Sequence, residues 1–92
     1  MRGDLHECYT IEHTLPEGEA AVTLTLDHAL PAQAGQFVMI WLPGLDEKPF
    51  SIMNDSPLTL AVAIVGPFTT ALSQKANGDQ IWVRGPYGHG FE

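Results

Sequence analysis

The stretch AAVTLTLD, residues 20–27, decides the fold class, because its apolar and polar residues alternate. Val22, Leu24 and Leu26 fall on one face of an extended chain, and the threonines between them fall on the other. A period of two predicts a β-strand with one side in the core and one side in water.

Further segments rich in β-forming residues lie on both sides of this strand, between turns that contain glycine or proline. These predicted strands are residues 6–15, 37–42, 47–55, 58–65 and 80–85. Residues 37–42, FVMIWL, are apolar on both faces, which predicts a central strand. Trp41 and Trp82 are predicted core residues.

One segment changes its period. Phe68, Leu72 and Ala76 recur at helical spacing after Pro67, and an Asn-Gly pair at 77–78 ends the run. The sequence therefore predicts a single all-β domain of six strands with one short helix, and glycine-rich PYGHGFE, residues 86–92, as a turn that follows the last strand.

The charge balance narrows the possible partners. Four Lys and Arg against eleven Asp and Glu give a net charge of −7, which disfavours binding to nucleic acid and to anionic membranes. The longest apolar runs are shorter than the ~20 residues that span a bilayer. The single cysteine, Cys8, cannot form an internal disulfide and is predicted to be a packed strand thiol. These features predict a soluble, cytoplasmic protein.

The stretch EKPFSIMND, residues 47–55, places Lys48, Pro49 and Ser51 where a strand begins. Proline donates no backbone hydrogen bond, so within a sheet it belongs at a strand start, an edge or a bulge. Something other than strand pairing could therefore contact this backbone. The simpler alternatives are a surface ion pair for Lys48 and a backbone hydrogen bond for the Ser51 hydroxyl.

A second candidate site lies where the helix begins. Gly66 precedes the helix, and Thr69 and Thr70 lie in its first turn. Unpaired N–H groups and the helix dipole favour an anion there, and the threonine hydroxyls add donors. The alternative is that Thr69 only caps the helix.

Three segments together carry a family resemblance: AGQFVMIWLPGLDEKPFSIMN, VGPFTTALSQ and GDQIWVRGPYGHGF, in that order. They resemble the flavin-binding domain of the ferredoxin-reductase-like superfamily, and within it the electron-transfer subunits of dihydroorotate dehydrogenase. The resemblance implies a six-stranded antiparallel Greek-key barrel that binds FAD at its edge.

The resemblance also implies roles for particular residues. Lys48 would approach the diphosphate or ribityl part, Ser51 and the Phe50 backbone would bond the edge of the flavin ring, and Pro49 would set the entry of the strand. Thr69 lies in the phosphate turn. The full set of implied cofactor-binding residues is Lys48, Pro49, Phe50, Ser51, Ala63, Val65, Gly66, Phe68, Thr69 and Thr70.

By the same resemblance, residues 1–92 are one FAD-binding barrel, without the NAD-binding and iron–sulfur domains that normally follow it. The expected partners are a catalytic dehydrogenase subunit or that missing half, and the chain is not expected to turn over NADH alone. An apolar face near Phe68, Tyr87 and Phe91 predicts a possible homodimer.

Departures from the family pattern leave alternatives open. Lys48 stands where arginine is usual, Phe68 where glycine is usual, and residues 61–63 lack the aromatic and basic groups that hold adenosine in better-known members. FMN is therefore an alternative to FAD. A cofactor-free β-barrel that binds a protein partner is the alternative to a redox module.

Overall fold

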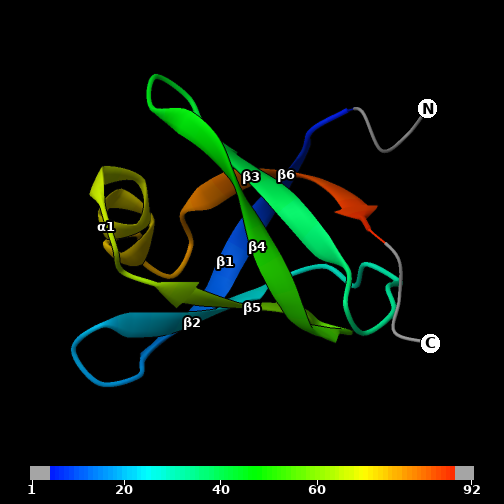
Figure 1. Cartoon of the computed structure of the whole chain (residues 1–92), viewed down its shortest axis with the longest axis horizontal. Helices are drawn as coiled ribbons and strands as arrows, with labels where there is room; N and C mark the ends of the chain where they lie inside the picture. The colour runs from blue at the N-terminus through cyan, green and yellow to red at the C-terminus, as the bar shows by residue number, and fades with distance from the viewer. Residues whose placement is uncertain (1–4, 89–92) are drawn as a thin grey trace.

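The computed structural model describes residues 5–88, which form a closed antiparallel barrel of six strands with one helix (Figure 1). The strands follow one another around the barrel in the order β1-β2-β5-β4-β3-β6. The elements are β1 (Glu7–Pro16), β2 (Ala21–Leu26), β3 (Phe37–Leu42), β4 (Asp46–Asp55), β5 (Leu58–Ala63), α1 (Pro67–Ser73) and β6 (Gln80–Tyr87). Tight connections join β3, β4 and β5, and β2 lies beside β5, which is a Greek-key arrangement. The predicted all-β barrel with one short helix is confirmed.

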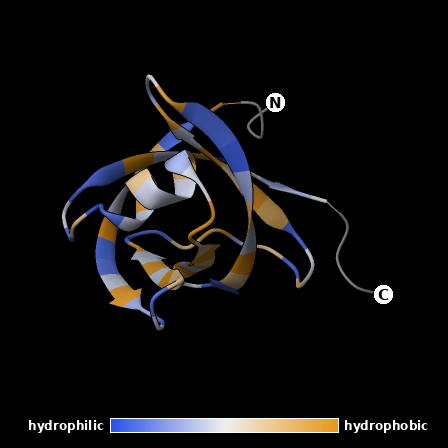
Figure 2. Cartoon of the chain, turned by 60° about the vertical axis from the view of Figure 1, so that its left-hand side comes forward, coloured by the Kyte–Doolittle hydropathy of each residue, from blue (hydrophilic) through white to orange (hydrophobic). Residues whose placement is uncertain are grey.

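The core of the barrel follows the alternation read from residues 20–27. Val22, Leu24 and Leu26 are buried on the inner face of β2, which pairs with β1 and with β5. Bands of alternating hydropathy run along the strands in Figure 2. The buried core comprises Tyr9, Ile11, Val22, Leu24, Leu26, Val38, Ile40, Leu42, Phe50, Leu58, Leu60, Val62, Phe68, Leu72, Ile81 and Val83.

Strand β3 pairs with β4 on one side and with β6 on the other, as expected of a central strand, but only one of its faces is buried. Val38 and Ile40 point into the core, whereas Trp41 on the outer face is 37% exposed. A closed barrel has a single inner face, so an apolar run in one of its strands must place half of its side chains outside. Trp41 and Trp82 accordingly pack edge-to-face on the outer surface, with ring centroids 6.0 Å apart, rather than in the core.

Two predicted boundaries also differ. The helix ends at Ser73, so Ala76 lies in the following loop. Strand β6 continues to Tyr87, which pairs with Phe37, instead of giving way to a turn at Pro86. The pairing of β3 with β6 shifts register before Tyr87, and Gly85 adopts a positive φ of 132° there. A Gly-Pro pair thus forms an irregularity within the strand instead of ending it.

Three further predictions concern exposure. Cys8 is exposed on β1 and is not a packed thiol. Phe68 is buried and cannot form part of an exposed homodimer face, while Phe91 lies outside the described residues. Among residues 5–88, no helix has the length and apolar character needed to cross a bilayer.

Candidate functional site: an open seam between β4 and β5

Strands β4 and β5 separate at one end of the barrel. Their pairing ends at Ile52 and Leu60, so residues 48–51 of β4 have no partner in β5 and residues 61–63 of β5 have none in β4. Each segment stays paired on its other side, with β3 and with β2 respectively. We call this gap the open seam. In Figure 1, β4 diverges from β5 toward α1.

The open seam explains the position of Pro49. The N–H of Ile52 donates to the Gln36 carbonyl on the β3 side. Because successive peptide groups of a strand point in alternate directions, the main-chain groups of Pro49 and Ser51 are turned toward the open seam. A missing proline N–H removes no ladder bond at such a position.

The open seam contains a groove of about 710 Å³, bounded by β4, β5, the start of α1 and one residue of β2. Its wall is largely apolar, and Lys48 is its one charged residue among those described. The lining residues are Ala21, Lys48, Pro49, Phe50, Ser51, Ala61, Val62, Ala63, Val65, Gly66, Pro67, Phe68 and Thr69.

The groove brings together the two segments that the sequence singled out, although they are about fifteen positions apart. Lys48, Pro49, Phe50 and Ser51 form one side. The predicted residues Ala63, Val65, Gly66, Phe68 and Thr69 contribute to the rest. Thr70 is exposed and does not line the groove. Sequence reasoning missed Ala21, because only the β2–β5 register places it opposite Ala63.

Two phenylalanine rings form the floor of the groove. Phe50 of β4 and Phe68 of α1 are both buried, and their rings stack with centroids 6.0 Å apart. At the rim, in contrast, Val65 is 83% exposed. An exposed valine beside an apolar wall is a surface that a ligand or partner could cover.

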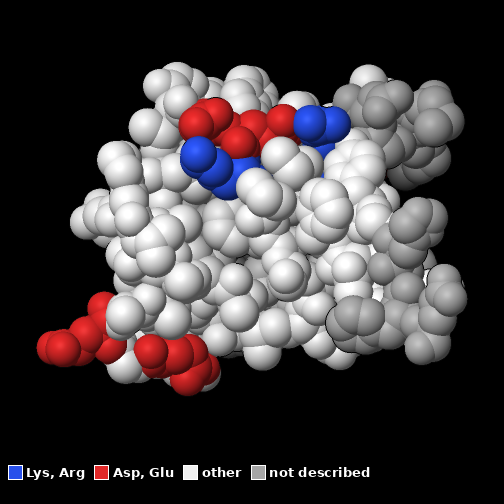
Figure 3. Space-filling view, viewed as in Figure 1, with Lys and Arg blue, Asp and Glu red and all other residues white. Residues whose placement is uncertain are grey.

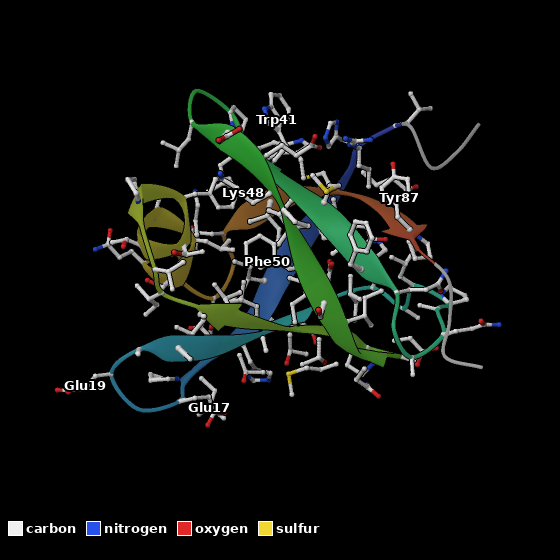
Figure 4. All side chains as sticks on the ribbon, in the orientation of Figure 1. Glu17, Glu19, Trp41, Lys48, Phe50 and Tyr87 are labelled. Atoms are coloured by element: carbon white, nitrogen blue, oxygen red, sulfur yellow. The ribbon has the colours of Figure 1, made fainter. Side chains whose placement is uncertain are left out.

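Polar groups of β4 line one side of the groove. No hydrogen bond of the Ser51 hydroxyl is found with any described residue, so its predicted backbone bond is not observed. Lys48 does form the surface ion pair considered above, with its Nζ 3.5 Å from Oδ2 of Asp46. Figure 4 shows Lys48 and Phe50 on the side of β4 that faces α1.

Thr69 caps the helix, as its simpler interpretation predicted. Its hydroxyl oxygen accepts hydrogen bonds from the N–H of Val65 at 2.8 Å and from the N–H of Gly66 at 3.1 Å. These two amides are therefore already satisfied within the protein. The N–H groups of Phe68 and Thr69 lie in the first helical turn, where an α-helix supplies no internal acceptor.

On the outer surface, Glu47 anchors a separate polar cluster next to Lys48. Arg84 Nε and Nη2 donate to the two Glu47 carboxylate oxygens at 2.6 and 2.7 Å, and His6 Nε2 lies 2.6 Å from Oε2. Hydrogen bonds from Arg84 lower the pKa of Glu47 to about 2, with a smaller contribution from His6 and against an opposing effect of burial. Arg84 also donates to the Tyr87 hydroxyl at 2.9 Å.

Sequence reasoning missed this cluster, because Arg84 is 37 positions from Glu47 and only the barrel brings them together. The cluster matters for the groove because Glu47 bonds to Arg84, and it is Asp46 that pairs with Lys48.

In Figure 3, charged side chains gather along the upper edge of the visible face and at its lower left, and the area between is uncharged.

The groove fits the requirements of a flavin. A flavin ring needs an apolar wall and donors or acceptors along one polar edge, and a phosphate-bearing tail needs donors at a distance from the ring. Pro49, Ala61 and Val65 supply apolar wall, and Ser51 supplies a hydroxyl. Lys48 and the first amides of α1 are the groups that would hold the tail.

Comparison with known proteins identifies relatives for nearly the whole chain. The chain is 40% identical over 87 residues to a probable dihydroorotate dehydrogenase B (NAD(+)), electron transfer subunit, of Thermococcus kodakarensis. This match covers 95% of the chain and 36% of the relative. The subunits of the same name from Pyrococcus abyssi and Methanocaldococcus jannaschii are 48% identical over 66 residues and 42% identical over 82 residues. Those matches cover 72% and 89% of the chain, and 26% and 31% of the relatives.

A solved structure shows the same fold. The cytochrome b5 reductase domain of Ulva prolifera nitrate reductase superposes with a TM-score of 0.77 at 15% identity, over 97% of this chain and 42% of that one. No protein-family model matches the sequence. The chain spans about a third of the length of the curated relatives that it matches. These findings confirm the resemblance predicted from the sequence: the chain is a homologue of one part of the dihydroorotate dehydrogenase B electron transfer subunits, with a ferredoxin-reductase-like barrel fold.

Proposed function

We propose that this chain is the flavin-holding module of an electron-transfer oxidoreductase. The observation that supports this function best is the open seam, where the barrel leaves main-chain groups of β4 unpaired beside an apolar groove. The relatives named electron transfer subunits support the redox role.

The proposed cofactor is FAD, with FMN as the alternative. Pro49, Phe50 and Ser51 would receive the ring and its polar edge, and Lys48, Ala63, Val65, Gly66, Phe68 and Thr69 would border the tail. Thr70 has no place in this arrangement, since it does not line the groove. A bound flavin supplies the electron chemistry, and the protein supplies binding, orientation and the electrostatic environment.

The expected partners follow from the relatives' names, which combine a dehydrogenase, NAD(+) and an electron transfer subunit. A catalytic dehydrogenase subunit would deliver electrons, and an NAD-binding and iron–sulfur half would pass them to NAD(+). The groove would hold the flavin between the two.

Binding of flavin by the purified protein tests the proposal. Riboflavin, FMN and FAD should each show quenched fluorescence and a perturbed visible spectrum when protein is added. Replacing Ala63→Leu fills the groove from an exposed wall position and should weaken binding at least tenfold. The matched variant Ala29→Leu, exposed in the loop after β2, should bind like the natural protein.

A second candidate function is a cofactor-free barrel that binds a protein partner. Its support is the exposed Val65 at the groove rim together with the internal capping of two amides by Thr69. Protein that stays colourless after incubation with all three flavins, and that gives no quenching, would favour this function over the first.

A further inference from the structure

Asp46 and Glu47 are neighbours on β4, but they have different partners. Glu47 is engaged by Arg84 through both carboxylate oxygens. Asp46 accepts the N–H of Glu47 through Oδ1 at 2.7 Å and reaches Lys48 through Oδ2 at 3.5 Å. The Glu47–Arg84 pair thus leaves Asp46 as the acid that contacts the one basic side chain of the groove.

The Asp46–Lys48 pair is weak enough to exchange partners. The two side chains are 57% and 51% exposed, and ion pairs at this exposure contribute little because water and salt screen them. The carboxylate is fixed by its bond to the Glu47 amide, whereas the lysine stem is flexible. Lys48 can therefore turn from Asp46 to an anion in the groove.

We infer that Asp46 is a specificity-determining residue, which competes with anionic ligands for Lys48 and so reduces the preference of the groove for charged over neutral ligands. This inference rests on the proposed function, because it assigns the charge of the ligand that the same groove takes. The surrounding charge supports it. Among residues 5–88, Lys48 is the one charged residue that lines the groove, so Lys48 and its carboxylate partner set the local sign of the potential.

The ratio of FMN affinity to riboflavin affinity measures this competition, since the two ligands share a ring and differ by one phosphate. Asp46→Asn should raise that ratio about two- to fivefold at low salt, the range expected for exposed ion pairs. Lys48→Gln should lower it. Because screening weakens both effects, the Asp46→Asn gain should shrink in 0.5 M salt.

Two controls separate a local effect from a change in net charge. Glu12→Gln removes one negative charge from an exposed position on β1, which lies opposite β4 in the barrel order. It should leave the ratio unchanged. In the Lys48→Gln background, Asp46→Asn should have a smaller effect than in the natural protein, because the residue acts through Lys48.

Inorganic pyrophosphate provides a test that needs no flavin. Its binding can be followed by the amide resonances of Lys48, Phe50 and Ser51, and Asp46→Asn should tighten it by a similar factor. An unchanged or lower affinity in both the FMN and the pyrophosphate series would overturn the inference. Absence of flavin binding in every variant would overturn the proposed function, and the pyrophosphate series would then decide the role of Asp46 alone.

Discussion

Phe50 and Phe68 stack beneath the groove, with their ring centroids 6.0 Å apart and their planes inclined by 22°. One ring comes from β4 and the other from α1, so this contact joins the two sides of the groove where β4 and β5 no longer pair. The pair belongs both to the core and to the floor of the site.

Truncation of Phe68 should therefore destabilise the whole barrel. Phe68→Ala is expected to lower the free energy of unfolding by about 3 kcal/mol, because it removes a buried ring and leaves a cavity. Val65→Ala, at the exposed rim of the same groove, should change it by less than about 0.5 kcal/mol. Urea denaturation of the two variants checks this, and equal losses would contradict the assignment of Phe68 to the core.

The Thr69 hydroxyl should matter more for stability than the Thr70 hydroxyl. Thr69→Val keeps the shape of the side chain but removes the acceptor for the Val65 and Gly66 amides, at an expected cost of about 1–3 kcal/mol. Thr70→Val changes an exposed side chain and should have almost no effect. Thermal unfolding of both variants measures the difference, and similar midpoints would argue against the capping role.

Glu47 should make stability depend on pH in the acid range. Its pKa is about 2 in the folded protein against an ordinary value of 4.5. Because the folded value is the lower one, the stabilisation is fully present above about pH 4.5 and is lost as the pH falls toward 2. Since the pair is partly exposed, we expect about 1 kcal/mol.

Comparison with Glu47→Gln isolates this contribution. The difference in unfolding free energy between the natural protein and the variant should be largest at pH 6–7 and should decline steadily below about pH 4.5. Urea denaturation at a series of pH values measures it. A difference that stays constant down to pH 2.5 would show that the carboxylate charge has no such role.

Gly66 offers a way to separate folding from binding. Its φ of 178° is extended backbone that other residues adopt, and a Cβ at this position would meet no atom within 4 Å. Gly66→Ala should leave the unfolding free energy within about 0.5 kcal/mol of the natural protein. Because the added methyl would enter the groove wall, flavin affinity should fall severalfold in fluorescence titrations. Unchanged affinity would place the ligand away from Gly66.

The sequence was sufficient for the strands because their alternation is local. The alternation that places Val22, Leu24 and Leu26 on one face predicts the inner face of the strand, even when the neighbouring strands are not known. Trp41 was misplaced because apolar character does not tell which side of a closed barrel a residue takes. The extent of β6 was missed because Gly85 and Pro86 are typical of turns, and only pairing with β3 keeps them in the strand.

The candidate site was partly predictable for a related reason. Lys48 and Thr69 stood out through local chemistry and a family resemblance, and the groove does contain both. The open seam itself was not predictable, since it depends on where two strands stop pairing. The bond between Arg84 and Glu47 was beyond reach for the same reason, because it forms only once β3, β4 and β6 lie side by side.

The open seam ties occupancy of the groove to the resistance of the barrel to unfolding. A molecule held between residues 48–51 and residues 61–63 would connect two backbone segments that do not pair with each other. By mass action, such a molecule at a hundred times its dissociation constant would add about 2.7 kcal/mol to the folded state. Amide exchange in those two segments would slow when the groove is occupied, and the empty barrel would be the more easily opened form.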